Sequence, residues 1–148
     1  VCSQIGPDSY RRYALARQRE LVAYIHAQGA MAKVHICGDT TAILPDMIST
    51  GAEIIDVDHL VLDMSKFVSI LGSHQVFSGN IDPVGTVMRG TEDMVIAGVD
   101  KCYHETAGRG IASAGCEIPG GTSNENLKAF AKAVRSCSRR LGHSGSES

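Results

Sequence analysis

The chain has 148 residues, of which 43% are hydrophobic, and its 14 Lys and Arg against 16 Asp and Glu give a formal net charge of -2. This length and apolar content suit one globular domain with a sizeable core. No basic run is long enough to follow a phosphate backbone, and no apolar stretch approaches the roughly 20 residues that cross a bilayer, so we expect neither nucleic-acid binding nor membrane insertion.

The five cysteines are odd in number and lack the spacing of a small disulfide-rich secreted domain. The N-terminus also lacks the basic and apolar regions of a signal peptide. We therefore expect reduced thiols and a cytoplasmic protein. The first residue is Val1 rather than Met, which suggests a processed or partial chain.

The first predicted element is an amphipathic helix from Pro7 to Gln28, with Gly29 as its stop signal. Its expected packed face carries apolar residues at near-helical spacing, at Tyr10, Ala14, Leu21 and Ile25.

Four short apolar runs follow, each too short for a helix and several of them rich in β-branched residues. They predict strands over residues 31–36, 53–57, 75–81 and 110–114. Helical patterns lie between and after these runs, at about 41–49, 63–71, 84–107 with a break at Gly90, and 124–141. This alternation predicts an α/β fold with parallel strands joined by right-handed helical crossovers.

Two of the helices have recognisable start signals. Thr91 is followed by two acidic residues, which favour the positive end of a helix. Thr122 and Glu125 have the spacing of a capping box. We expect one domain over residues 1–142 and a disordered tail over residues 143–148, which has no apolar content to bury.

A candidate metal site begins with His35 and Cys37, which are spaced to face the same side of one strand. Cys116 follows the last predicted strand, and the C-terminal ends of parallel strands share one rim. Three ligands without an obvious fourth suit a catalytic Zn²⁺ that keeps one position open. The alternative is that these residues are ordinary core packing, because cysteine is among the most often buried residues.

Carboxylates and an amide repeat this geometry on the middle strands. Asp56 and Asp58 share a face at one strand end, and Asn80 and Asp82 do so on the next strand. Asp58, Asn80 and Asp82 are therefore candidate catalytic residues that could bind substrate or hold a neighbouring ligand in place. Helix capping and turn formation explain them equally well.

The combined motifs resemble the uroporphyrinogen decarboxylase superfamily, and within it the corrinoid-dependent methyltransferase branch that contains the methylcobamide:coenzyme M methyltransferases. The resemblance spans about residues 7–134 and depends on the order and spacing of four segments, 35–38, 79–83, 113–119 and 125–129. In that branch a His-X-Cys and a distant Cys bind zinc, which implies His35, Cys37 and Cys116 as the ligands here. The decarboxylases lack this set.

The resemblance implies the C-terminal half of a (β/α)8 TIM barrel, with four parallel strands and a leading helix. It also implies a zinc-dependent transfer of a methyl group from a methylated corrinoid, which a corrinoid protein carries. The acceptor would be a thiol like coenzyme M or a molecule like tetrahydrofolate. Because four strands cannot close the barrel, we expect self-association or an N-terminal half that completes it.

Two alternatives remain open at this point. One is a lyase that resembles uroporphyrinogen decarboxylase and uses Asp58 or Asp82 without a metal. The other is a non-catalytic half-barrel fragment or assembly subunit.

Overall fold

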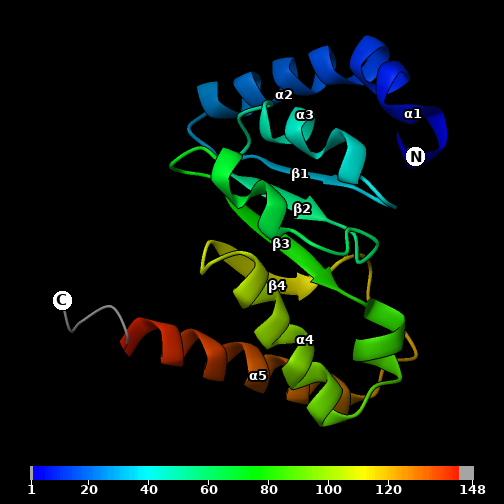
Figure 1. Cartoon of the computed structure of the whole chain (residues 1–148), viewed down its shortest axis with the longest axis vertical. Helices are drawn as coiled ribbons and strands as arrows, with labels where there is room; N and C mark the ends of the chain where they lie inside the picture. Colours follow the sequence, from blue (N-terminus) through cyan, green and yellow to red (C-terminus); the bar gives the residue numbers. More distant parts are fainter. Residues whose placement is uncertain (1, 144–148) are drawn as a thin grey trace.

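The sheet has four parallel strands in the order β1-β2-β3-β4 (Figure 1). This computed structural model describes the backbone of residues 2–143 and the side chains of residues 4–137. The strands are β1 (Lys33–Ile36), β2 (Ile54–Val57), β3 (Val76–Ile81) and β4 (Gly110–Ala114). Each lies within its predicted range, which confirms the assignment of the short β-branched runs to strands.

Helices connect the strands, as the alternating pattern predicts. They are the 3₁₀ helix η2 (Thr41–Ile43), α3 (Leu44–Ile48), the 3₁₀ helix η3 (Ser65–Ile70), the π-helical turn η4 (Pro83–Met88), α4 (Glu92–Glu105) and α5 (Asn124–His143). The fold class is therefore confirmed: four parallel strands alternate with helices, and a helical segment precedes them.

The leading segment differs from the single helix predicted over residues 7–28. It consists of α1 (Cys2–Tyr10), the π-helical turn η1 (Arg11–Leu15) and α2 (Ala16–Ala27), and Gly6 has a non-helical backbone with φ 76°. A π turn places an extra residue in the helix and so rotates the side chains that follow it. As a result Leu15 and Val22 are buried, whereas the predicted Leu21 is 59% exposed.

The two predicted helix starts have different outcomes. Thr91 caps α4 as expected, because its side chain accepts a hydrogen bond from the Met94 amide. The capping box at Thr122 is wrong: the hydroxyl of Ser123 accepts the hydrogen bond from the Asn126 amide at 3.1 Å instead. α5 extends to His143, and residues 144–148 of the predicted tail lie outside the described residues.

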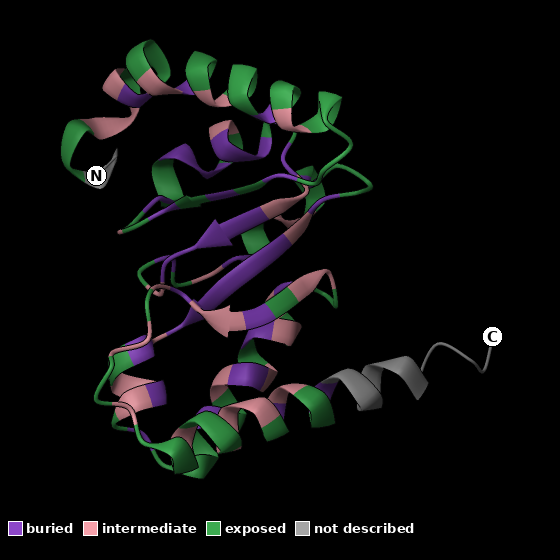
Figure 2. Ribbon diagram, turned by 180° about the vertical axis from the view of Figure 1, so that it is seen from behind, coloured by how far each residue is buried: buried purple, intermediate pink, exposed green. Residues whose placement is uncertain are grey.

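The core lies between the sheet and the helices on one of its faces. In β1, Val34 and Ile36 are buried on that side, whereas Lys33 and His35 point to the opposite face and are exposed. Figure 2 shows that no helix among the described residues crosses this opposite face. The open face therefore leads from the strands to the rim where the predicted metal ligands lie.

No helix within residues 2–143 is both long enough and apolar enough to pass through a bilayer.

Candidate metal centre

The three predicted ligands converge at the C-terminal rim of the sheet. Nε2 of His35 lies 3.3 Å from Sγ of Cys37, which lies 3.7 Å from Sγ of Cys116. One ligand atom from each residue falls within 4.8 Å of the others, and among the described residues this is the one group of its kind. The sequence prediction that these three side chains meet is therefore consistent with the geometry.

The spacing of these atoms fits a tetrahedral zinc ion. Zn–S bonds of about 2.3 Å and Zn–N bonds of about 2.0 Å place two ligand sulfurs about 3.8 Å apart, and a nitrogen and a sulfur about 3.5 Å apart. The sulfur pair at 3.7 Å and the nitrogen–sulfur pair at 3.3 Å lie close to these separations. Two thiols and one imidazole are also a donor set that zinc prefers.

The convergence requires the chain after β4 to reach across the sheet. Strands lie about 4.8 Å apart, so β1 and β4 would be separated by about 14 Å in a flat sheet. The sheet twists, and the Gly115 amide donates a hydrogen bond to the Ile81 carbonyl at 2.8 Å. A Cβ on Gly115 would stand 2.3 Å from the backbone nitrogen of His59, so only glycine allows this close approach, which places Cys116 beside Cys37.

The two thiols influence each other electrostatically. The hydrogen bond with Cys116 raises the pKa of Cys37 above its ordinary value, and desolvation and the negative Asp58 add to this shift. Without a metal the Cys37 thiol therefore keeps its proton at neutral pH. Cys102 is a different kind of cysteine, because burial raises its pKa to about 12 and its thiol donates to the Gly79 carbonyl at 2.8 Å.

Asp56 lies beside the imidazole, and Lys33 contacts Asp56. The sequence placed Asp56 with Asp58 at a strand end but did not select it as a catalytic candidate, and it did not indicate Lys33. Asp56 Oδ2 lies 3.3 Å from His35 Nδ1 and 2.7 Å from Lys33 Nζ. Asp56 is the register partner of His35 in the β1–β2 pair. Aligning the two predicted strands by their C-terminal ends would have placed them together, so a signal existed in the sequence.

Asp58 anchors the loop that carries Cys37. Its Oδ2 accepts a hydrogen bond from the Gly38 amide at 2.8 Å, and its Oδ1 accepts one from the Leu60 amide at 3.1 Å. Its Oδ1 also lies 2.7 Å from Nδ1 of His59. Asp58 therefore lies beside the metal-competent group and holds the backbone next to Cys37, which is compatible with the predicted role of holding a ligand in place.

Asn80 and Asp82 lie away from the three ligands. The Asn80 amide donates to the Val61 carbonyl at 2.6 Å, and Asp82 accepts hydrogen bonds from the Val84 and Gly85 amides as the cap of η4. Both line a separate hollow of about 270 Å³ that also includes side chains from α4. Capping and backbone support, the alternative interpretation, account for the contacts of both residues, and their catalytic roles stay a prediction.

A groove of about 400 Å³ opens directly beside the ligands. Its walls include two of the three candidate ligands together with polar and apolar side chains. The lining residues are Lys33, His35, Asp56, Ser113, Ala114, Cys116, Glu117, Ile118 and Phe130. Space for a second molecule therefore exists next to the ligand atoms.

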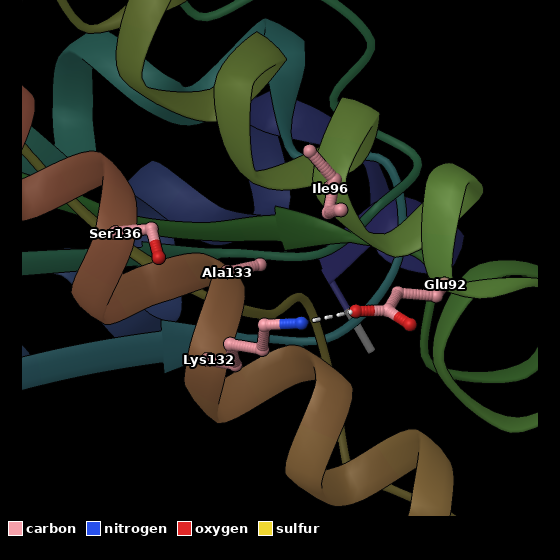
Figure 3. Close-up of a pocket in the computed structure, with 5 residues that line it drawn as sticks. All are labelled: Glu92, Ile96, Lys132, Ala133 and Ser136. Atoms are coloured by element: carbon pink, nitrogen blue, oxygen red, sulfur yellow. Dashed lines mark hydrogen bonds and ion pairs between the residues drawn. The ribbon is translucent and has the colours of Figure 1, made fainter.

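Another hollow, of about 270 Å³, lies between α4 and α5 (Figure 3). Glu92 and Lys132 form an ion pair of 2.9 Å across it, and its other lining residues are Ile96, Ala133 and Ser136. These side chains include no group of metal-binding or nucleophilic residues like that at the rim, so the rim is the stronger candidate.

A parallel α/β sheet with an open inner face corresponds to part of a barrel fold, and the His-Cys-Cys group at its C-terminal rim has the donor atoms to hold a metal ion. The family comparison is more specific: residues 1–137 match the uroporphyrinogen decarboxylase (URO-D) family, and the chain belongs to this family.

Several relatives are methyltransferases by name. The chain is 33% identical over 131 residues to the methylcobamide:CoM methyltransferase MtbA of Methanosarcina mazei, covering 88% of this chain and 38% of the relative. It is 31% identical over 143 residues to a uroporphyrinogen decarboxylase of Synechococcus sp. (strain CC9605), covering 94% of this chain and 39% of the relative.

A solved structure of a methyltransferase from Methanosarcina mazei superposes with a TM-score of 0.78 at 25% identity, covering 88% of this chain and 37% of that one. The chain thus spans less than two fifths of the length of these relatives and corresponds to their C-terminal half, as the resemblance implied.

Proposed function

We propose that this chain is the zinc-binding part of a corrinoid-dependent methyltransferase, which transfers a methyl group from a methylated corrinoid on a partner protein to a thiol acceptor. The observation that carries the proposal is the convergence of His35, Cys37 and Cys116 within 4.8 Å at the rim of the sheet. The similarity to methylcobamide:CoM methyltransferases supports it.

His35 would hold the ion through Nε2, and Cys37 and Cys116 would hold it as thiolates. Zinc with three protein ligands and one open position binds an acceptor thiol, lowers its pKa and keeps it as an electron-rich thiolate, the form that accepts a methyl group. Two thiolates and a neutral imidazole would balance the charge of the ion. A charge-neutral site of this kind favours activation of a thiol nucleophile over Lewis-acid catalysis of hydrolysis.

The groove beside the ligands supplies room for the acceptor. A small thiol of the coenzyme M kind is our first choice, because the names of several relatives specify CoM. An acceptor like tetrahydrofolate is the second choice. The methylated corrinoid would approach the same rim on its carrier protein.

Catalysis by this chain requires additional structure. In the described residues β1 and β4 each pair with one strand, so the outer edge of each is unpaired. Exposed strand edges and an uncovered inner face are unfavourable in an isolated protein. We propose that an N-terminal half or a second copy of the chain completes the barrel.

The metal content of the purified chain tests the proposal directly. We expect one zinc per chain in the wild type and strongly reduced zinc in Cys116→Ser, because two protein ligands hold zinc poorly. Cys102→Ser is the matched control, since Cys102 is buried away from the site and serine keeps a donor for the Gly79 carbonyl. Zinc far below one per chain in the wild type, or full retention in Cys116→Ser, would refute the site.

Activity separates the remaining candidates. With methylcobalamin as donor and a thiol as acceptor, we expect the chain assembled into a completed barrel to catalyse methylation. A chelator and Cys37→Ala should both abolish this activity while the circular dichroism spectrum is unchanged. Decarboxylation of a porphyrinogen that persists after chelation would instead favour the metal-free lyase. Light scattering examines the third candidate, because a barrel completed by self-association predicts a dimer and an isolated fragment predicts a monomer or aggregates.

A further inference from the structure

The two ring nitrogens of His35 face different partners. Nε2 lies 3.3 Å from Cys37 Sγ, on the side of the metal-competent group, and Nδ1 lies 3.3 Å from Asp56 Oδ2. We infer that Asp56 is a positioning residue, whose carboxylate holds the ring in the tautomer that leaves the Nε2 lone pair free for a metal. This inference rests on the proposed zinc site and deepens it.

The backbone places Asp56 opposite the imidazole. β1 and β2 are parallel and pair residue by residue, and in this register His35 lies beside Asp56. A shift of one residue would present Ile55 or Val57 in its place, and neither can accept a hydrogen bond. The carboxylate therefore has a fixed position that does not depend on a flexible loop.

The chemistry of the pair determines which nitrogen carries the proton. A neutral imidazole has one N–H donor and one acceptor nitrogen, and an ionised carboxylate can only accept. With Asp56 at Nδ1, the favourable arrangement is Nδ1–H donating to the carboxylate. Nε2 then keeps its lone pair toward Cys37, which is the arrangement that metal-bound histidines use.

Lys33 completes the arrangement from the same strand. It lies two residues before His35, so both side chains project from the same face of β1. Its Nζ is 2.7 Å from Asp56 Oδ2, the same oxygen that faces the imidazole. The ion pair with Lys33 keeps Oδ2 directed at the ring.

Structural stability alone does not account for Asp56. The residue is only 7% exposed, and its Oδ1 is buried without a hydrogen-bond partner among the described residues. A buried polar atom without a partner is destabilising. The partner Lys33 has a side chain that is 51% exposed, so solvent screens the ion pair and it adds little stability. A role in orienting His35 explains why a carboxylate occupies this position.

The test measures the ring and the metal separately. In Asp56→Leu, which has a similar size but no acceptor, we expect the ¹⁵N chemical shifts of the neutral, metal-free His35 ring to move from the Nδ1–H form toward the Nε2–H form. Because that form cannot coordinate through Nε2, we expect zinc affinity, measured by competition with a chelator, to fall about 10- to 100-fold.

The chain contains a matched control. His26 and Glu53 form another imidazole–carboxylate pair, 3.0 Å apart and built from different elements. We expect Glu53→Gln to leave both the His35 ¹⁵N shifts and the zinc affinity unchanged. This outcome would show that removing a carboxylate elsewhere in the chain does not reproduce the effect of Asp56→Leu.

The possible outcomes distinguish this inference from the proposed function. If the wild type binds zinc and Asp56→Leu changes neither the affinity nor the ring tautomer, the role of Asp56 is overturned and the zinc site stands. If the wild type binds no zinc, the proposed function fails, and the ¹⁵N shifts of the metal-free variants still decide the role of Asp56. If Asp56→Leu does not fold, Asp56→Val also removes the acceptor and suits a strand, and unchanged affinity and tautomer in that variant would overturn the inference.

Discussion

Replacing Gly115 by alanine tests how the rim brings the cysteines together. The added Cβ would stand 2.3 Å from the backbone nitrogen of His59 and 2.8 Å from the carbonyl carbon of Asp58, whereas ordinary contacts begin at 3.4 Å. Both neighbours are backbone atoms and cannot rotate away, so the chain must move by about 1 Å. Overpacking of this kind costs about 1–3 kcal/mol of unfolding free energy.

The same movement displaces the neighbouring Cys116. Metal–ligand distances tolerate deviations of only about 0.2 Å. A displacement of about 1 Å therefore weakens coordination, and we expect zinc affinity to fall about tenfold or more, which corresponds to about 1.4 kcal/mol or more. The prediction thus combines a loss of stability with a loss of metal binding.

Urea denaturation and chelator competition measure the two effects on the same samples. Gly120→Ala is the matched control: Gly120 lies in the same connection between β4 and α5, and a Cβ there has no heavy atom within 4 Å. We expect the control to change the unfolding free energy by no more than about 0.5 kcal/mol. Equal stability and equal zinc affinity of the two variants would show that the close approach at Gly115 is not required.

Two further predictions concern thiol reactivity and helix capping. In the metal-free chain we expect maleimide to modify the exposed Cys37 much faster than the buried Cys102, and zinc to protect Cys37; equal rates, or no protection, would contradict this. For Asp82→Ala we expect the unfolding free energy to fall by about 1 kcal/mol at pH 7, because the variant lacks the cap of η4. Burial raises the pKa of Asp82, but hydrogen bonds from the Gly85 and Val84 amides outweigh it and bring the pKa below its ordinary value. This contribution is therefore present above the unfolded pKa of about 3.9 and is lost as the pH falls through the lower folded pKa. Urea titrations of the wild type and Asp82→Ala at pH 7 and in acid would show the difference between their unfolding free energies becoming smaller as the pH falls. A difference that does not change with pH would refute the contribution of the Asp82 charge.

Local patterns in the sequence predicted most of the secondary structure. The short β-branched runs became β1 to β4, and Thr91 begins α4, because strand propensity and capping depend on neighbouring residues. The same reasoning failed where the backbone departs from regular geometry. The π turn η1 rotates α2 relative to the residues before it, so Leu21 faces outward although its spacing from Tyr10 and Ala14 predicts burial.

The sequence alone predicted the candidate ligand set, because His35 and Cys37 share a strand face and Cys116 follows the last strand. Only the tertiary structure brings these atoms within 4.8 Å, because sheet twist and the close approach of Gly115 to His59 act between segments far apart in the chain. Tertiary structure also decided the surroundings of the site. Strand register places Asp56 beside His35, whereas Asn80 and Asp82 turn to other partners, and no local periodicity carries that information.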